Sequence, residues 1–178
     1  RKLIIKTSIV IAFAVLILLL IFGSALNQFY QPLSSLDSAK AFNVRSGDSL
    51  SVIAGGLVDE QILSSSDLFR FMAWWRGVDA LLQAGEYQFG PGNSQADILQ
   101  MLVDGEVLQY RITFIEGWRF SDVMGAMSSA PGLKTTLDGI TPEALAAHLG
   151  LEVSHPEGML HPDTYFYERG TTDLELLR

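Results

Sequence analysis

Four acidic side chains are the candidates for acid–base chemistry in this sequence: Glu116, Glu157, Asp163 and Glu168. A carboxyl group acts as a general acid only if it is protonated near neutral pH, which requires a desolvated pocket. Each of the four lies in a polar or turn-like stretch, where a carboxylate more often caps a helix or hydrogen-bonds a loop. Asp163, directly after Pro162, is typical of a turn residue that bonds its own backbone. A structural role is therefore the simpler interpretation of each carboxylate.

Other side chains that bind metals or attack substrates give no recognisable pattern. His148, His155 and His161 lack an HExxH arrangement and are spread across a loop-like stretch, so no metal site is predicted. The sequence contains no Gly-x-Ser-x-Gly, no Ser-x-x-Lys and no phosphate-binding glycine-rich loop. It also contains no cysteine, which excludes disulfides and a thiol nucleophile. We expect no cofactor.

The charge distribution argues against nucleic acid as a partner. The chain has 12 Lys+Arg against 20 Asp+Glu, a net charge of −8. Three of those cations, Arg1, Lys2 and Lys6, lie at the very start, so the rest of the chain is still more acidic. Such a surface without a basic run repels phosphate backbones and anionic headgroups. An uncharged or mixed-charge polymer stays open as a ligand.

A long apolar run opens the sequence and predicts a membrane segment. Leu3 to Phe22 reads LIIKTSIVIAFAVLILLLIF, interrupted only by Lys6, and about 20 such residues span a bilayer. Cations flank only its first end, so the N-terminus should be cytoplasmic and the remainder exported. Gly23-Ser24-Ala25 leaves a cleaved signal peptide as the alternative. The run is longer than a typical signal-peptide core, which favours an uncleaved anchor at 1–22.

The segment after the anchor reads as a linker at 23–41, followed by one local pattern that occurs three times. Each copy has an alternating strand, a turn centred on glycine and an amphipathic helix: AFNVRSGDSLSVIAGGL, GEYQFGPGNSQADILQML and YRITFIEGWRFSDVMGAM. Gly47, Gly92 and Gly117 should adopt positive φ at these corners. Asp48, Ser94 and Ser121 are the predicted helix caps, and Ser94 with Asp97 predicts a capping box.

The remaining segments predict two further helices and a loop, which is consistent with an α+β fold. SSSDLFRFMAWWRG predicts a helix capped by Ser66 and ended by Gly77, with Leu68, Phe71, Met72 and Trp75 on one face. Trp74 and Trp75 could stack on sugar rings, although we expect at least one of them in the core. Thr141 and Pro142 predict the start of a short helix. The segment HPEGMLHPDTYFYERG contains two prolines, two glycines and a Tyr-Phe-Tyr cluster. This density predicts a loop with a defined conformation.

The first corner resembles the opening half of a LysM module. Phe42, Val44, Gly47-Asp48-Ser49-Leu50 and Ile53-Ala54 match the pattern of that family. LysM modules bind glycans that contain N-acetylglucosamine, so the resemblance implies a cell-wall ligand and a sugar contact for Asp48. A simple strand-to-helix corner explains the same residues, because the corner recurs at Gly92 and Gly117 without the Asp-Ser pair. An additional helix after LLQAGEYQF also departs from the LysM pattern.

The order of all these parts resembles the endolytic murein transglycosylase, or YceG-like, family. An N-terminal anchor is followed by AGEYQF, GNSQADILQMLVDGE, FIEGWRFSDV and finally EGMLHPDTYFY, the most specific segment. The family cleaves peptidoglycan strands between N-acetylmuramic acid and N-acetylglucosamine without water, leaving 1,6-anhydro ends. Its catalytic glutamate lies in a Glu-Lys-Glu-Thr-like stretch beyond the Pro-Asp-Thr-Tyr motif, and this sequence contains no such stretch. The resemblance implies substrate contacts, not catalysis, for Glu157, Asp163 and Tyr165.

We therefore expect an α+β protein with one N-terminal transmembrane helix. The expected parts are an anchor at 1–22, a linker at 23–41, a LysM-like module at 42–107 and the first part of a catalytic domain at 108–178. The final run, TTDLELLR, reads as the interior of a domain. The expected location is the bacterial inner membrane with the bulk of the chain in the periplasm. The resemblance implies partnership with penicillin-binding proteins and other elongation proteins. The alternative is a noncatalytic, membrane-anchored scaffold that binds peptidoglycan.

Overall fold

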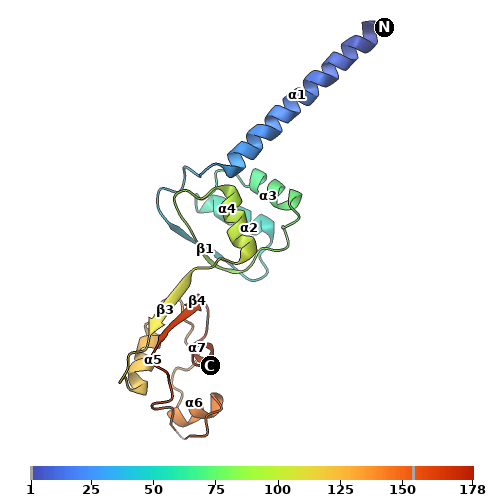
Figure 1. The fold of residues 1–178 in the computed structure, drawn as a ribbon. Helices are drawn as coiled ribbons and strands as arrows, with labels where there is room; N and C mark the ends of the chain where they lie inside the picture. Colours follow the sequence, from blue (N-terminus) through green and yellow to red (C-terminus); the bar gives the residue numbers. More distant parts are fainter. Residues whose placement is uncertain (1, 154) are drawn as a thin grey trace. The chain divides into compact units, whose positions relative to one another are not determined.

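The computed structural model describes residues 2–153 and 155–178 and has a mixed α+β fold. The chain divides into two compact units, residues 1–106 and 107–178. Figure 1 traces the order of the elements along the chain. The α+β class expected from the sequence is confirmed.

The first unit joins a long helix to a small α+β module. Helix α1 (Lys2–Tyr30) leads into strand β1 (Lys40–Val44), helices α2 (Leu50–Asp59) and α3 (Ser66–Trp75), strand β2 (Gly85–Phe89) and helix α4 (Gln95–Asp104). Strands β1 and β2 pair antiparallel, with Phe42 opposite Tyr87. Apolar side chains from every element fill the core; the largest fully buried ones include Phe29, Ile53, Leu57, Phe69, Tyr87, Phe89, Ile98, Leu99 and Leu102. The predicted order of strands and helices is confirmed.

Helix α1 is longer than the apolar run that predicted it. It contains a stretch from Ile9 to Tyr30 that is long and apolar enough to cross a membrane, and a signal sequence meets the same criterion. Residues 23–30, which we expected in a linker, continue the helix, and Phe29 and Leu36 are buried in the module. The linker interpretation is therefore wrong for this part. Leu33 N–H also bonds Asn93 O at 2.9 Å, and Ser35 Oγ bonds Ile62 O at 2.6 Å.

Two of the predicted helix caps need correction, and the capping box is confirmed. Ser49, not Asp48, caps α2, because its Oγ accepts from Val52 N–H, whereas Asp48 lies one residue too early. The Ser94–Asp97 box is present at α4. At the third corner Asp122 accepts from Arg119 N–H, so Ser121 is not the cap. The turn glycines 47, 92 and 117 all have positive φ, of 89°, 95° and 85°.

Helix α3 buries a different face from the one we predicted. Ser65 caps it, one residue before the expected Ser66, and its buried residues are Phe69, Met72 and Ala73. Of the predicted face only Met72 is buried; Leu68 is half-buried, and Phe71 and Trp75 are exposed. Trp74 is exposed as well, so the expectation that one tryptophan lies in the core is wrong. The helix is rotated by about one residue, or roughly 100°, from the predicted orientation.

The second unit combines a two-stranded sheet with short helices. Strand β3 (Gln109–Thr113) pairs antiparallel with β4 (Thr164–Glu168), and helices α5 (Phe120–Ser128), α6 (Pro142–His148) and α7 (Asp173–Leu176) complete it. Thr141 caps α6 and Pro142 is its first residue, as predicted. The main core cluster consists of Ile112, Phe114, Val123, Met127 and Tyr167. The Tyr165-Phe166-Tyr167 segment was expected in a loop and is a strand instead.

Candidate functional site

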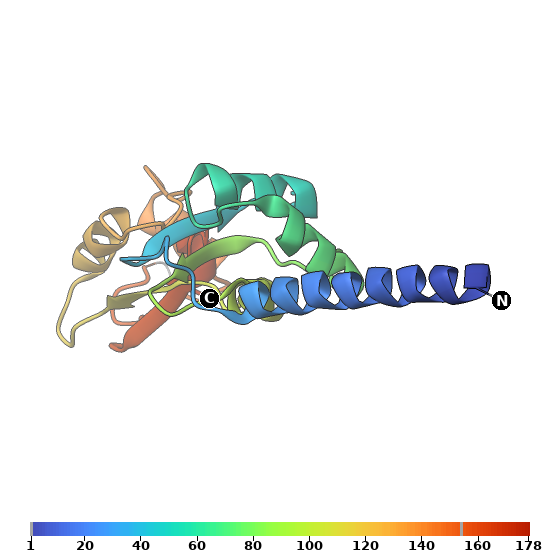
Figure 2. The ribbon, with the colours of Figure 1, turned by 90° about the horizontal axis from the view of Figure 1, so that it is seen from above.

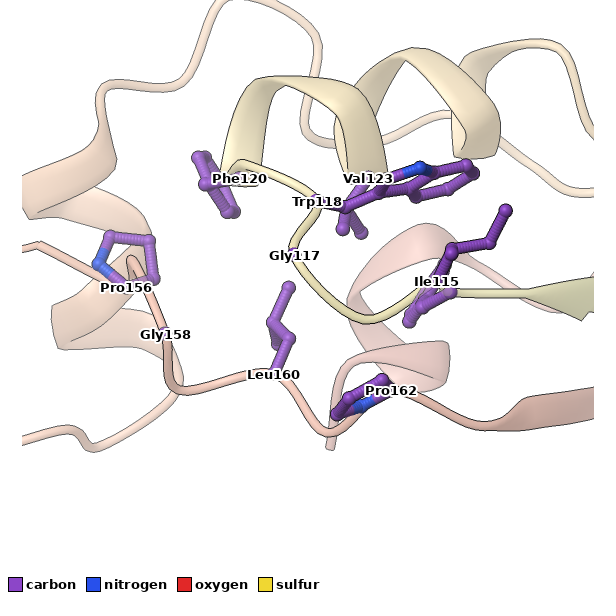
Figure 3. A pocket seen from close by; sticks show the side chains of 10 residues that line it. Ile115, Gly117, Trp118, Phe120, Val123, Pro156, Gly158, Leu160 and Pro162 are labelled. Carbon is purple, nitrogen blue, oxygen red and sulfur yellow. The ribbon is translucent and has the colours of Figure 1, made fainter.

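A pocket in the second unit forms where two segments meet that are far apart in the sequence. The turn between β3 and α5 provides Gly117, Trp118 and Phe120, and the loop before β4 provides Pro156, Gly158, Leu160 and Pro162. Figure 3 shows Phe120 and Leu160 reaching into the space between the two segments. Gly117, at φ 85°, makes the sharp turn that brings the first segment round. Phe114, Ile115 and Val123 complete the lining.

The lining of this pocket is aromatic, apolar and rich in proline and glycine. Its volume is about 240 Å³, below the range of roughly 300–1,000 Å³ usual for pockets that enclose a small molecule. Trp118 is half-buried and packs against the core cluster of the second unit. Aromatic faces of this kind stack on the apolar face of a sugar ring. The pocket is therefore smaller than one that encloses a whole small-molecule ligand.

Glu157 holds the two segments together. Its Oε1 and Oε2 accept from Phe120 N–H at 3.3 and 3.2 Å. Phe120 is the first residue of α5, where free N–H groups and the helix dipole favour a negative charge. His155 lies beside it, with Nδ1 accepting from Glu157 N–H at 3.1 Å and its ring 6.0 Å from that of Phe120. Glu157 therefore links the start of α5 to the loop before β4.

Asp163 and Tyr165 hold the other end of the same loop. Asp163 Oδ1 accepts from Thr164 N–H at 2.7 Å, and its backbone O accepts from Phe114 N–H at 2.9 Å. The turn role predicted for Asp163 is thus confirmed. Tyr165 donates its hydroxyl to His161 O at 2.8 Å and lies 5.0 Å from the Phe114 ring, centroid to centroid. It lines a neighbouring hollow that shares Phe114 and Leu160 with the pocket.

Asp48 belongs to the other unit and has a local structural role. Its Oδ2 accepts from Arg45 N–H at 2.9 Å, which closes the turn between β1 and α2. The structure thus brings Glu157, Asp163 and Tyr165 to one region of the second unit, while Asp48 stays in the first. Within the part of the chain that the structure describes, no group of three or more acidic, histidine or cysteine residues is placed to hold a metal ion.

Sequence reasoning missed the aromatic residues that line the pocket. Phe114, Trp118 and Phe120 all come from the FIEGWRF segment, which we interpreted as a corner and as part of the family resemblance, without assigning its aromatic residues to a site. Their convergence with Pro156 depends on the pairing of β3 with β4 across some fifty residues of sequence. A local pattern carries no information on such a pairing. The available signal was the unusual density of aromatic, proline and glycine residues in both segments.

Comparisons with known proteins identify the family to which these converging segments belong. The YceG-like family profile matches residues 42–178, more than half of the chain. The chain therefore belongs to the YceG-like family. It is 27% identical over 150 residues to the endolytic murein transglycosylase of Bacillus subtilis strain 168, covering 75% of this chain and 41% of that protein.

Among solved structures, the chain is similar to the crystal structure of a YceG-like protein from Listeria monocytogenes. The identity is 20% and the TM-score 0.39, over 78% of this chain and 51% of that one. The chain spans about two fifths of the length of the Bacillus protein and about half of the Listeria chain.

Proposed function

We propose that the full-length protein is a membrane-anchored, endolytic peptidoglycan lytic transglycosylase. It cleaves the bond between N-acetylmuramic acid and N-acetylglucosamine in nascent glycan strands and so terminates their elongation. The observation that carries this proposal is the family match over residues 42–178. The similarity to a Bacillus protein named endolytic murein transglycosylase supports it.

The reaction needs one acid–base carboxyl group. The carboxyl donates its proton to the glycosidic oxygen, and the bond from that oxygen to the muramic acid C1 breaks. The 6-hydroxyl of the same muramic acid then bonds to C1 and returns its proton to the carboxylate. The products are a 1,6-anhydro end and a free 4-hydroxyl, with no water consumed. We assign this carboxyl to the Glu-Lys-Glu-Thr-like stretch that the family resemblance implies, and not to Glu157 or Asp163, which accept hydrogen bonds from backbone N–H groups.

In this scheme the pocket of the second unit is a contact for one sugar of the strand. Trp118 stacks on the ring, and Glu157, Asp163 and Tyr165 keep the two lining segments in place. The whole of 108–178 is the first part of the catalytic domain. Residues 42–107 form a LysM-like module, which holds the strand or the neighbouring domain. Penicillin-binding proteins and other elongation proteins are the partners that supply nascent strands.

The pocket proposal is tested by replacing Trp118 with alanine in the full-length protein. Stacking contributes about 0.5–1.5 kcal/mol beyond buried area, so KM for glycan strands should rise up to about tenfold. The matched control is Phe166→Ala, since Phe166 is an exposed aromatic of the same unit that does not line the pocket. Equal effects of the two substitutions would remove the pocket from the substrate path.

We further propose that 1–22 is an uncleaved anchor with a cytoplasmic N-terminus, in the inner membrane of a bacterium. Cations flank only the first end of the apolar run, which supports this orientation. A reporter active only in the periplasm should work when fused after Lys40, and the membrane-bound protein should retain its apolar segment in mass spectrometry. Activity of a cytoplasmic reporter at Lys40 contradicts the orientation, and loss of residues 1–25 contradicts the anchor.

A further inference from the structure

Helix α3 presents an aromatic surface that its own unit does not cover. Phe71, Trp74 and Trp75 are 42%, 64% and 62% exposed. The Phe71 ring lies 6.2 Å from that of Trp74 and 6.1 Å from that of Trp75, centroid to centroid, so the three rings form one patch. We call these three residues the α3 aromatic patch. Contiguous apolar patches of large side chains on a protein surface mark sites of contact with a protein or a membrane.

The patch lies against the apolar helix that opens the chain. Trp75 and Phe22 of α1 are in edge contact, with ring centroids 6.2 Å apart. At the other end of α3, Leu68 lines the same hollow as Gln28 and Gln31, near the end of α1. Helix α3 therefore extends from the last residues of α1 back toward Phe22. Figures 1 and 2 both show α3 beside this part of α1.

The length of the apolar run places that contact at a membrane boundary. Leu3 to Phe22 is twenty residues, and a rise of 1.5 Å per residue makes them about 30 Å long, the thickness of the hydrocarbon core of a bilayer. When the core is counted from Leu3, its outer boundary falls at Phe22, the residue that Trp75 contacts, and the apolar stretch of α1 continues past this point to Tyr30. Tryptophan is enriched at this depth, because its ring is apolar and its N–H is a hydrogen-bond donor.

The charges around the patch suit the same location. Arg70 and Arg76 are exposed on either side of Phe71, Trp74 and Trp75. Arginine near a bilayer surface interacts with lipid phosphates and extends its apolar stem along the chains. Arg76 also donates to Gln100 Oε1 at 2.9 Å, which leaves its other N–H groups for this contact. Asp67, which lies beside Arg70 and Phe71, is the one carboxylate in this lining.

We propose that the α3 aromatic patch is a second membrane contact, inserted at the headgroup level of the outer leaflet that α1 crosses. The occupant of the patch is phospholipid, and Arg70 and Arg76 contact its phosphates. The contact holds the module of the first unit against the membrane surface and so limits the tilt of α1 and the module together. This inference rests on the proposed uncleaved anchor, and it adds a surface that hydropathy alone does not reveal.

The test measures how deep Trp74 and Trp75 lie in a bilayer. Trp118→Phe leaves them as the only tryptophans of the chain. The 178-residue Trp118→Phe variant is reconstituted in vesicles of phosphatidylethanolamine and phosphatidylglycerol that contain brominated lipid. Bromine near the carbonyl end of the acyl chains should quench the fluorescence more than bromine near the chain ends. Acrylamide, a quencher dissolved in the water, should quench the tryptophan fluorescence of the reconstituted variant less than that of the same variant unfolded in urea.

A matched control places tryptophan elsewhere in the same unit. Val52 is an exposed apolar residue near the start of α2. Tryptophan at position 52, with the three natural tryptophans replaced by phenylalanine, should be quenched by acrylamide and little by brominated lipid. If Trp74 and Trp75 behave like position 52, the proposal is wrong. If their shielding from acrylamide depends on protein concentration and not on lipid, a second copy of the chain covers the patch, which also overturns it.

A third variant separates this proposal from that of the anchor. Phe22→Trp in the same tryptophan-free background reports on α1 itself. Quenching by brominated lipid at position 22 but not at Trp74 and Trp75 refutes the second membrane contact and leaves the anchor intact. Absence of quenching at position 22 refutes the anchor, and the second contact with it.

Discussion

Among the described residues of the second unit, Asp173 is a buried carboxylate with several hydrogen bonds. Its side chain, only 2% exposed, accepts from the N–H groups of Thr136, Leu137 and Leu174 and from the Thr136 hydroxyl. Burial by itself raises the pKa of Asp173, but the hydrogen bonds from Thr136, Leu137 and Leu174 outweigh it, and the pKa is lowered overall. Asp173 thereby ties the 134–137 segment to α7.

Asp173→Asn should destabilise the second unit by about 2–3 kcal/mol, because a buried N–H loses a charged acceptor and meets an NH₂ group. The folded-state pKa lies below the unfolded value, so the contribution of Asp173 is complete above about pH 4 and is lost as pH falls through the folded pKa. Urea unfolding at neutral and acid pH measures this. Glu175→Gln is the control, since Glu175 is an exposed cap on Thr172 and should matter less. A pH-independent gap between the wild type and Asp173→Asn would contradict the account.

Asp48 provides a prediction in the first unit. Its bond to Arg45 N–H closes the turn, so Asp48→Ala should cost about 1 kcal/mol of stability and leave binding to peptidoglycan sacculi unchanged. Ser49→Ala is the comparison, because Ser49 caps α2, and a lost cap costs about as much. Thermal melting and co-sedimentation with sacculi measure the two properties. Lost sedimentation with unchanged melting would assign Asp48 to the sugar instead.

The caps show how closely residue roles can be predicted from sequence. Ser94, Thr141 and Asp163 have the roles that their spacing predicted. We also predicted three caps at Asp48, Ser66 and Ser121, and in the structure a neighbouring residue has the capping role in each case. The reason is that the ends of helices can be predicted only to within one or two residues. The roles of Glu157 and Asp173 could not be predicted, since their partners lie 37 residues away in sequence.

Helix α1 is part of the core of the first unit as well as a candidate membrane span. Phe29 is completely buried, whereas its neighbour Tyr30 is 61% exposed. Phe29→Ala should therefore destabilise the first unit by about 3–5 kcal/mol, through lost burial and the cavity left behind. Tyr30→Ala, one residue further along the same helix, should cost less than about 1 kcal/mol. Urea unfolding in detergent solution compares the two, and similar losses would mean that α1 is not packed on the module.

Local patterns predicted elements well where an element is defined by its own residues. The three strand-turn-helix corners are confirmed because alternation, a positive-φ glycine and an amphipathic helix are all contained in one short segment. The exposed face of α3 and strand β4 were not predicted. Two overlapping faces of α3 have helical spacing, and only packing selects Phe69 over Phe71. Strand β4 is fixed by its pairing with β3, which local patterns do not encode.

In the molecule as a whole, the two units carry different candidate sites. The first unit carries the candidate span and the α3 aromatic patch, and the second carries the pocket that the YceG-like segments form. Glu157 and Asp163, two carboxylates of the loop that lines this pocket, accept hydrogen bonds from backbone N–H groups. The proposed cleavage therefore uses a carboxyl group other than these two.

The measurement that tests this most directly compares the 178-residue chain with the full-length protein on nascent glycan strands. Both are incubated with the strands, and mass spectrometry of the muropeptides detects 1,6-anhydro ends. We expect the full-length protein to form these ends, with Glu157→Gln retaining most of that activity, and the 178-residue chain to form none. A full-length protein that binds strands but forms no such ends would indicate a noncatalytic scaffold. Anhydro ends formed by the short chain and abolished by Glu157→Gln would contradict the account, because they would place the catalytic acid at Glu157.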